Sequence, residues 1–232
     1  MIDETSNPPG QATLECLLPY VRQRLRSRES LCVVCCGDSV SEVGRTPGNF
    51  GGASGAQAHW GTLLLDKIAR RFETANVQVR FFGVGGQNSY EGLGRLDGLA
   101  ACNPHLVLLE FGLNDCGYHP LPPAATHLAL RTLIEGVRAR FDADALLVTS
   151  GGDNPRSPRL KNWEATYLIL RAVAQECRVP LADVRAVMLS ATNDGSDWGA
   201  FHNGADDVHP KDAGHRVWAE TVYKTLVDEL GY

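Results

Sequence analysis

The sequence predicts a three-layer α/β/α sandwich around a five-stranded parallel sheet, and three observations lead to this fold class. Short apolar segments alternate with longer segments of helical periodicity, which is the pattern of right-handed βαβ units. The apolar segments are nearly continuous, as in strands of a parallel sheet that is covered on both faces. A chain of 232 residues with 44% hydrophobic and 21% charged residues has the size and composition of one globular domain.

The first half of the chain supplies two predicted helices and three predicted strands. Residues 14–25 are predicted to be helical because Leu17, Leu18 and Val21 follow helical spacing. The basic run that overlaps this helix, residues 21–28, is interpreted as a solvated helix face. A second helical pattern covers residues 60–72. The apolar segments 31–36, 77–82 and 106–111 are the predicted strands.

The second half continues the alternation. Residues 145–149 and 179–184 are the two remaining predicted strands. Helical periodicity covers residues 125–141, 163–177 and 213–230. Residues 1–10, which end in Ser-Asn-Pro-Pro-Gly, are predicted to be a flexible tail, and no interdomain linker is visible after them. The chain is therefore predicted to be a single domain over residues 11–232.

Charge and hydropathy exclude some classes of partner. A net charge of −5 and an isoelectric point near 5.8 argue against nucleic acid and against an anionic membrane surface, because both favour concentrated Lys and Arg. No segment is long and apolar enough to predict a membrane span. The acidic N-terminus lacks the features of a secretion signal, so we expect a cytoplasmic protein. The scattered aromatic residues do not predict an oligomeric state.

The seven cysteines favour a reducing compartment, because their number is odd and three of them lie in an apolar run. Cys32, Cys35 and Cys36 lie in the first predicted strand, where thiols behave as small hydrophobic groups. The C-x-x-C spacing of Cys32 and Cys35 leaves a metal or redox site as the alternative. The histidines show no metal-binding spacing with one another or with the cysteines. We therefore predict neither a metal nor a cofactor.

Polar motifs follow the predicted strands, where a ligand site is expected because ligands of parallel sheets bind outside the carboxyl ends of the strands. The first motif is Gly37-Asp38-Ser39-Val40. A serine on this turn would be exposed near a helix N-terminus, with its backbone N–H available to an oxyanion. The same residues are also common in turns and at helix N-caps, so the motif by itself does not identify a site.

Two further motifs follow the second and third predicted strands. Residues 83–89 are rich in glycine, which lets backbone N–H groups approach a ligand closely. Their spacing does not fit a dinucleotide-binding loop, and the glycine-rich stretch 44–55 lacks the Gly-Lys-Ser/Thr ending of a phosphate-binding loop. Gly112-Leu113-Asn114-Asp115 follows the third strand. The Asn114 amide is a second type of oxyanion donor, although Asn and Asp are also common in turns.

The fourth motif is Asp206-Asp207-Val208-His209-Pro210, directly before the last predicted helix. A carboxylate three residues before a histidine can reach the imidazole Nδ1. This contact would fix the tautomer and leave Nε2 for a serine hydroxyl. A single histidine is equally well explained as a surface or capping residue, so the argument depends on the four motifs together.

In their order, Gly-Asp-Ser, Gly, Gly-x-Asn-Asp and Asp-x-x-His-Pro resemble the four sequence blocks of the SGNH hydrolases, a branch of the GDSL esterases and lipases. The resemblance covers about residues 31–225. It implies a flavodoxin-like SGNH hydrolase fold and a serine esterase that works through an acyl-enzyme. Two positions depart from the pattern: Val40 replaces the Leu of the GDSL motif, and Asn88 stands where Thr is frequent.

The resemblance also implies a role for each matching residue. Ser39 would be the nucleophile, His209 the general base and Asp206 the residue that orients His209. The oxyanion hole would consist of the Ser39 and Gly86 backbone N–H groups and the Asn114 side chain. Two alternatives stay open: Gly85 for Gly86, and Asp207 for Asp206. Asp38 and Asp115 are interpreted as structural residues of their turns.

Substrate contacts are predicted from polar loop residues with a few interspersed aromatics. They are Arg45, Asn88, Asp153, Trp198 and Phe201. Such a set suits a small-molecule ester with a short acyl group, acetyl above all, on a polar alcohol such as a sugar, whose ring would stack on the aromatic side chains. No long apolar lid is visible in the sequence, which argues against a lipase of lipid droplets.

Three other functions are compatible with the same architecture. A thioesterase or lysophospholipase would use the same machinery with an apolar acyl channel, and a series of acyl chain lengths would identify it. A non-catalytic ligand-binding module would have lost part of the four blocks, which are intact in this chain. A nucleotide-binding flavodoxin-like protein would share the sheet but would bind a nucleotide and hydrolyse no ester.

Overall fold

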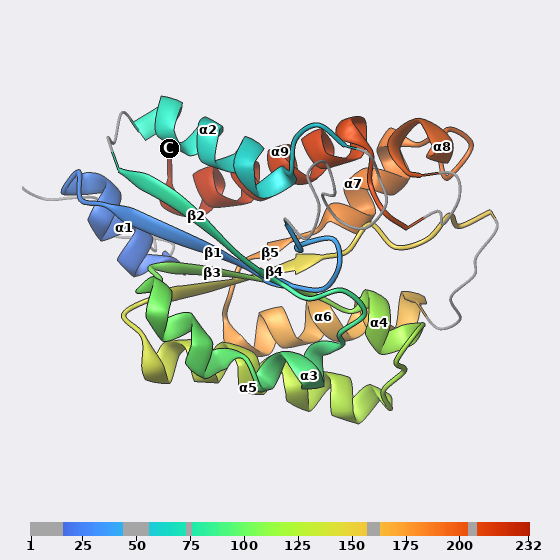
Figure 1. Ribbon diagram of the computed structural model, residues 1–232, viewed down its shortest axis with the longest axis horizontal. Helices are drawn as coiled ribbons and strands as arrows, with labels where there is room; N and C mark the ends of the chain where they lie inside the picture. Colours follow the sequence, from blue (N-terminus) through green and yellow to red (C-terminus); the bar gives the residue numbers. More distant parts are fainter. Residues whose placement is uncertain (1–15, 44–55, 73–75, 157–162, 204–207) are drawn as a thin grey trace, which may run out of the picture.

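The computed structural model describes residues 16–43, 56–72, 76–156, 163–203 and 208–232. These residues form a five-stranded sheet in the order β2-β1-β3-β4-β5, in which all neighbouring strands are parallel. The strands all point toward one edge of the sheet, so their carboxyl ends lie together (Figure 1). The predicted fold class, an α/β sandwich with a parallel sheet of this size, is confirmed.

The elements alternate along the chain as the hydrophobic pattern predicts. The strands are β1 (Leu31–Gly37), β2 (Val77–Gly83), β3 (Leu106–Phe111), β4 (Asp144–Thr149) and β5 (Leu181–Ala182). The longer helices are α1 (Pro19–Arg26), α2 (Trp60–Phe72), α5 (Pro123–Arg140), α6 (Trp163–Cys177), α7 (Val184–Ala191) and α9 (Asp212–Leu230). The shorter ones are α3 (Ser89–Leu93), the 3-10 helix η1 (Leu96–Cys102), α4 (Leu113–Cys116) and α8 (Trp198–Phe201).

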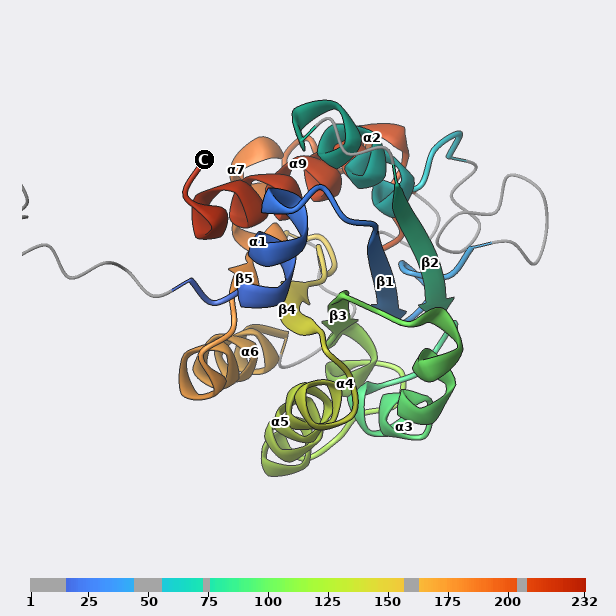
Figure 2. The ribbon, with the colours of Figure 1, turned by 90° about the vertical axis from the view of Figure 1, so that its left-hand side faces the viewer.

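Helices cover both faces of the sheet and make the three layers. Helices α1, α2, α7 and α9 lie on one face, and α3, η1, α5 and α6 lie on the other (Figure 2). Because side chains alternate along a strand, β1 contributes to both cores: Cys35 packs on the first face and Cys36 on the second. Both thiols are buried, as predicted for small apolar groups.

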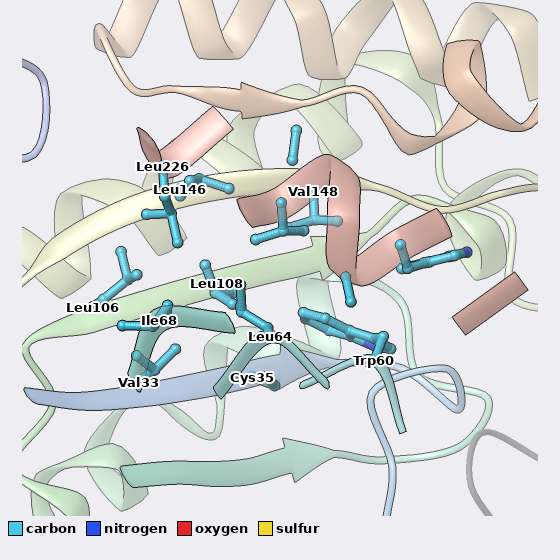
Figure 3. Packing of buried hydrophobic residues seen from close by; sticks show 14 of the residues in the cluster. Val33, Cys35, Trp60, Leu64, Ile68, Leu106, Leu108, Leu146, Val148 and Leu226 are labelled. Carbon is cyan, nitrogen blue, oxygen red and sulfur yellow. The ribbon is translucent and has the colours of Figure 1, made fainter. Parts of the chain in front are cut away.

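The core on the first face joins the middle of the sheet to α2 and α9. Val33 and Leu108 project from neighbouring strands toward Leu64 and Ile68, which lie one helical turn apart on α2 (Figure 3). All four side chains are at most 2% exposed. Burial of a side chain of this size stabilises a fold by about 1.5–3 kcal/mol, so this packing holds the strand ends of the site in place.

Two predicted segment boundaries are wrong. Helix α1 begins at Pro19, because Leu18 has the non-helical dihedral angles φ −125° and ψ 60° of an N-cap and proline is favoured in the first turn. Strand β5 has 2 residues, not the six predicted for residues 179–184. The Asp183 side chain accepts a 3.0 Å hydrogen bond from the Ala186 N–H, so Val184 begins helix α7. The predicted pattern missed this cap.

His59, just before α2, is fully buried and has a defined tautomer. Its Nε2 lies 2.8 Å from the Val40 carbonyl oxygen, which requires an Nε2–H donor. Its Nδ1 accepts a 3.0 Å hydrogen bond from the Gly61 N–H. A proton on Nδ1 would break this bond. Burial, with a smaller contribution from the neighbouring His215, lowers the pKa of His59 to about 3.

We expect His59 to make the fold sensitive to acid. Below pH 6.5 the unfolded chain binds a proton at this position that the folded chain does not bind, so the free energy of unfolding decreases as the pH falls toward 3. The loss attributable to His59 is at most about 1.4 kcal/mol per pH unit. In urea unfolding, His59→Gln should be less stable than wild type at pH 7.5, and this difference should shrink between pH 6.5 and pH 4.5.

The partly exposed His127, which pairs with Glu176, offers a matched control. The stability difference between wild type and His127→Gln should change little over the same pH range. Other buried groups, such as Asp144, whose pKa is raised to about 6 mainly by burial, affect wild type and variant equally. A stability difference for His59→Gln that stays constant with pH would contradict a neutral buried His59.

Candidate active site

Ser39 lies on the tight turn that leaves β1 at the carboxyl edge of the sheet. The turn is closed by a 3.2 Å hydrogen bond from the Ser41 N–H to the Asp38 carbonyl oxygen. The Asp38 carboxylate accepts a 2.9 Å hydrogen bond from the Val40 N–H, which confirms that Asp38 is a structural residue of this turn. Asp38, Val40 and Ser41 are buried while Ser39 is half-buried, so the turn presents its serine to the surface.

The Ser39 hydroxyl meets an imidazole from the far end of the chain. Ser39 Oγ and His209 Nε2 are 2.8 Å apart, although the two residues are 170 positions apart in the sequence. The His209 loop lies directly before α9 and is tied to the segment after α8, since the His209 carbonyl oxygen accepts a 2.8 Å hydrogen bond from the Asn203 N–H. This is the hydrogen-bond geometry of a serine nucleophile and its base. Asp206 and its alternative Asp207 lie outside the described residues.

Free backbone donors lie beside Ser39. Within the described residues, no protein acceptor receives a hydrogen bond from the N–H of Ser39, Gly85 or Gly86. Gly86 has the left-handed φ of +81°, which turns the backbone there at a low cost only for glycine. A Cβ on Gly85 would lie 3.7 Å from the Ser39 Cβ, so this loop is next to the serine. The choice between Gly85 and Gly86 as donor stays open.

Asn114 connects three of the four sequence motifs. Its side chain is 2% exposed, and its Nδ2 donates to the Gln87 carbonyl oxygen at 2.9 Å. A second, longer contact of 3.4 Å joins Nδ2 to Asp38 Oδ2. Because the contact to Asp38 is weak, the second N–H of Nδ2 is available to an oxyanion, while the hydrogen bond to Gln87 keeps the amide in place.

Asp115 anchors the neighbouring loop rather than the reacting groups. Its carboxylate accepts hydrogen bonds from the backbone N–H of Ser89, at 3.1 Å, and from the Ser89 hydroxyl. The interaction ties α4 to the N-terminus of α3. This confirms that Asp115 is structural.

A second buried carboxyl group, that of Glu110 on β3, lies beneath the serine turn and was not predicted. Glu110 and Asp38 are both fully buried and interact. Burial raises the pKa of Asp38 to about 6. Burial and the adjacent Asp38 raise the pKa of Glu110 well above its usual range. An acidic residue inside the otherwise apolar segment 106–111 was the signal that could have identified it.

Three of the predicted substrate contacts are buried and engaged in other interactions. Asn88 is a helix cap: it accepts from the Glu91 N–H at 3.0 Å and donates to the His119 carbonyl oxygen at 3.0 Å. Trp198 is 1% exposed and stacks on His202 with a ring separation of 4.1 Å, so its faces are not open to a sugar.

The three remaining predicted contacts have different outcomes. Asp153 is 1% exposed, and its carbonyl oxygen accepts a 2.7 Å hydrogen bond from Arg185. Phe201 is partly buried and packs against the core of the first face. Arg45 lies outside the described residues. The sequence pattern placed these side chains in loops but gave no information on whether they are buried.

An apolar cluster next to His209 was also not predicted. Leu113, Trp163 and Val208 are each at most 4% exposed and pack together between α4, α6 and the His209 loop. The Arg185 guanidinium lies 5.9 Å from the Trp163 ring and donates to the Gly151 carbonyl oxygen at 2.8 Å. Arg185 thereby ties the loop after β4 to this cluster. These contacts join residues far apart in the sequence, so no local pattern reports them.

The described residues lack the features that a metal site or a membrane span requires. In that part of the chain, no group of three or more His, Cys, Asp or Glu side chains is placed to hold a metal ion. None of the helices described is long and apolar enough to cross a membrane. All seven cysteines lie in the described residues and are free thiols.

The fold and the paired serine and histidine at its carboxyl edge define the class of the protein as a carboxylic-ester hydrolase with an α/β fold. Residues 35–217 match the GDSL-like lipase/acylhydrolase family, so the chain belongs to this family. The predicted resemblance to the SGNH and GDSL hydrolases is thus confirmed. No curated protein sequence matches the chain significantly.

Several solved structures share the fold. An acetylxylan esterase of Geobacillus stearothermophilus superposes with a TM-score of 0.66 at 17% identity, over 87% of this chain and 94% of that chain. A two-domain esterase active on acetylated mannans gives a TM-score of 0.73 at 18% identity, over 94% of this chain and 54% of that one. A hydrolase from the metagenome of Lake Arreo, Spain, gives 0.68 at 18% identity over 88% of this chain and 97% of that chain. At these identities the likeness shows the common fold.

Proposed function

We propose that the protein hydrolyses esters of a short acyl group, acetyl above all, with a polar carbohydrate-like alcohol, through an acyl-enzyme on Ser39. The observation that carries the proposal is the 2.8 Å contact between Ser39 Oγ and His209 Nε2 beside the free N–H groups of Ser39, Gly85 and Gly86. A nucleophile, a base and oxyanion donors are the parts that acyl transfer requires.

In the proposed mechanism, Ser39 Oγ attacks the ester carbonyl carbon while His209 Nε2 accepts the hydroxyl proton. The backbone N–H groups of Ser39 and Gly86 and the Asn114 amide stabilise the oxyanion of the tetrahedral intermediate. His209 then donates the proton to the departing alkoxide, and the acyl group remains on Ser39. Water attacks this ester with the same assistance, which releases the acid and restores the serine. Asp206 is proposed to orient His209.

Two observations support a small acyl group and a sugar-like alcohol. The buried cluster of Leu113, Trp163 and Val208 fills apolar space next to His209. A site whose apolar space is already filled by side chains suits a short acyl group, whereas a long acyl chain needs an extended apolar channel. Two proteins that share this fold are an acetylxylan esterase and an esterase active on acetylated mannans.

A comparison of acyl chain lengths and alcohols tests the proposal. We expect kcat/KM for p-nitrophenyl esters to be highest at acetyl or butyryl and to fall steadily toward palmitoyl. Purified protein should also release acetate from acetylated xylo- or manno-oligosaccharides. An optimum at palmitoyl would identify a lysophospholipase-type specificity, and preference for acyl thioesters would identify a thioesterase. A folded protein that hydrolyses none of these substrates would support a binding module instead.

A further inference from the structure

Glu110 is the one acidic residue of β3, and it lies directly across from the end of β1. In the strand register, Glu110 is the partner of Gly37, two residues before Ser39. A Cβ on Gly37 would lie 2.8 Å from Glu110 Oε2 and 2.3 Å from its carbonyl oxygen. Only glycine leaves this space, so the Glu110 side chain can lie beneath the serine turn. Its exposure is 0%.

The Glu110 carboxyl group makes specific contacts to this turn. The Ser41 hydroxyl donates to Glu110 Oε2 at 3.0 Å, and the Asp38 backbone N–H lies near the carboxyl group. Glu110 Oε1 is buried and receives no hydrogen bond from the described residues. The Asp38 carboxyl group is within hydrogen-bonding reach. Two carboxylates cannot hydrogen-bond each other, but a carboxylic acid and a carboxylate can.

The surroundings favour one proton on the pair. Two negative charges in contact inside a protein repel strongly, and each also loses hydration, so a buried carboxyl pair keeps one proton. The titratable groups that face the pair are Asp115, His209 and the thiols of Cys35 and Cys36. Arg95 donates to the carbonyl oxygen of Gly37, the strand partner of Glu110, at 2.9 Å.

We propose that Glu110 is a positioning residue that shares one proton with Asp38 and thereby holds the Asp38 carboxylate where it orients both the Ser39 turn and the Asn114 amide. The inference rests on the proposed function. One oxygen of Asp38 accepts from the Val40 N–H at 2.9 Å, and the other contacts Asn114 Nδ2 at 3.4 Å. Glu110 touches no reacting atom. It acts on the nucleophile and on the oxyanion donor through Asp38.

Loss of the proton has a definite structural consequence. When Glu110 ionises at alkaline pH, the two carboxylates repel and Asp38 is pushed from its hydrogen bonds to the turn and to Asn114. An amide at position 110 cannot ionise, and it can still donate N–H to Asp38 and accept from Ser41. Glu110→Gln should therefore preserve the arrangement at every pH, whereas Glu110→Leu removes both hydrogen bonds at a similar size.

The shared proton can be observed without any substrate. Infrared difference spectra of wild type minus Glu110→Gln at pH 7.5 should contain the carbonyl band of a buried protonated carboxylic acid. The bands of other carboxyl groups, such as Asp144, cancel in the difference spectrum because both proteins contain them. Absence of this band would overturn the inference. This measurement does not depend on ester hydrolysis, so it separates failure of this inference from failure of the proposed function, which wild type alone would reveal.

Kinetics test the positioning. Glu110→Leu should lower kcat for p-nitrophenyl acetate about 10- to 100-fold with little change in KM, because a small displacement of reacting groups has an effect of this size. Glu110→Gln should recover most of that loss. The alkaline decline of kcat in wild type should be absent or displaced to higher pH in Glu110→Gln. The proposal is wrong if Glu110→Gln is as impaired as Glu110→Leu while both variants remain folded by circular dichroism. It is also wrong if the alkaline declines of kcat in wild type and Glu110→Gln coincide.

Discussion

Replacing Ser39 with alanine should lower kcat for p-nitrophenyl acetate by about 10⁴- to 10⁶-fold, the range found when a catalytic serine or its partner is removed. The physical reason is that Ser39 Oγ is the proposed attacking oxygen, and His209 Nε2, 2.8 Å away, is the proposed base that accepts its proton. His209→Ala should lose a similar amount. The double variant should lose little more than either single variant, because the two groups act as one unit.

Labelling distinguishes loss of the nucleophile from a general disturbance. An organophosphorus ester should add one phosphoryl group to wild type and none to Ser39→Ala, as measured by mass spectrometry. Ser190→Ala, which changes an exposed serine on α7, is the matched control and should keep full activity and labelling. Equal hydrolysis by wild type and Ser39→Ala would remove Ser39 as the nucleophile.

Replacing Asn114 with alanine should lower kcat by about 100- to 1,000-fold and leave KM nearly unchanged. An oxyanion donor acts mainly on the tetrahedral transition state, so its loss appears in kcat rather than in substrate binding. The 2.9 Å anchor to the Gln87 carbonyl oxygen makes this donor preorganised, which is the condition for an effect of this size.

Asn114 also has a structural contact, so folding must be measured beside activity. Thermal unfolding should show that Asn114→Ala retains a cooperative transition. Asn76→Ala, an exposed asparagine in the turn before β2, is the matched control and should leave kcat unchanged. An increase in KM at unchanged kcat would assign Asn114 to substrate binding instead, and unchanged kinetics would end its proposed role.

Much of the fold was readable in the sequence because local patterns carry it. The predicted limits of α2 and α6 agree with the structure to the residue, since apolar residues recur there at helical spacing over three or more turns. Strand β5 was predicted at residues 179–184 but has only 2 residues, and the short helices α3, α4 and α8 escaped prediction. Elements this short contain too few residues to show the apolar repeat of a helix or a strand. Caps such as Asp183 decide where such elements begin and end.

The candidate site was likewise predictable only in part. Serine, glycine and asparagine motifs directly after successive strands predicted that these residues meet, because the carboxyl ends of parallel strands lie at one edge. The burial of Asn88, Asp153 and Trp198 was not predictable, since loop residues of the same type are exposed or buried according to their neighbours in space. Glu110 was overlooked for the same reason: its partner Asp38 is 72 positions away.

By itself, the sequence determined the alternation of strands and helices, the parallel sheet and the motifs placed at its edge. These follow from periodicity and from residue types at fixed local spacing. Only the tertiary structure decided that His209 reaches Ser39, that Arg185 ties the loop after β4 to Trp163, and that Glu110 lies under the serine turn. The physical reason is that contacts between distant residues depend on strand register and on packing of the whole core, which no local segment encodes.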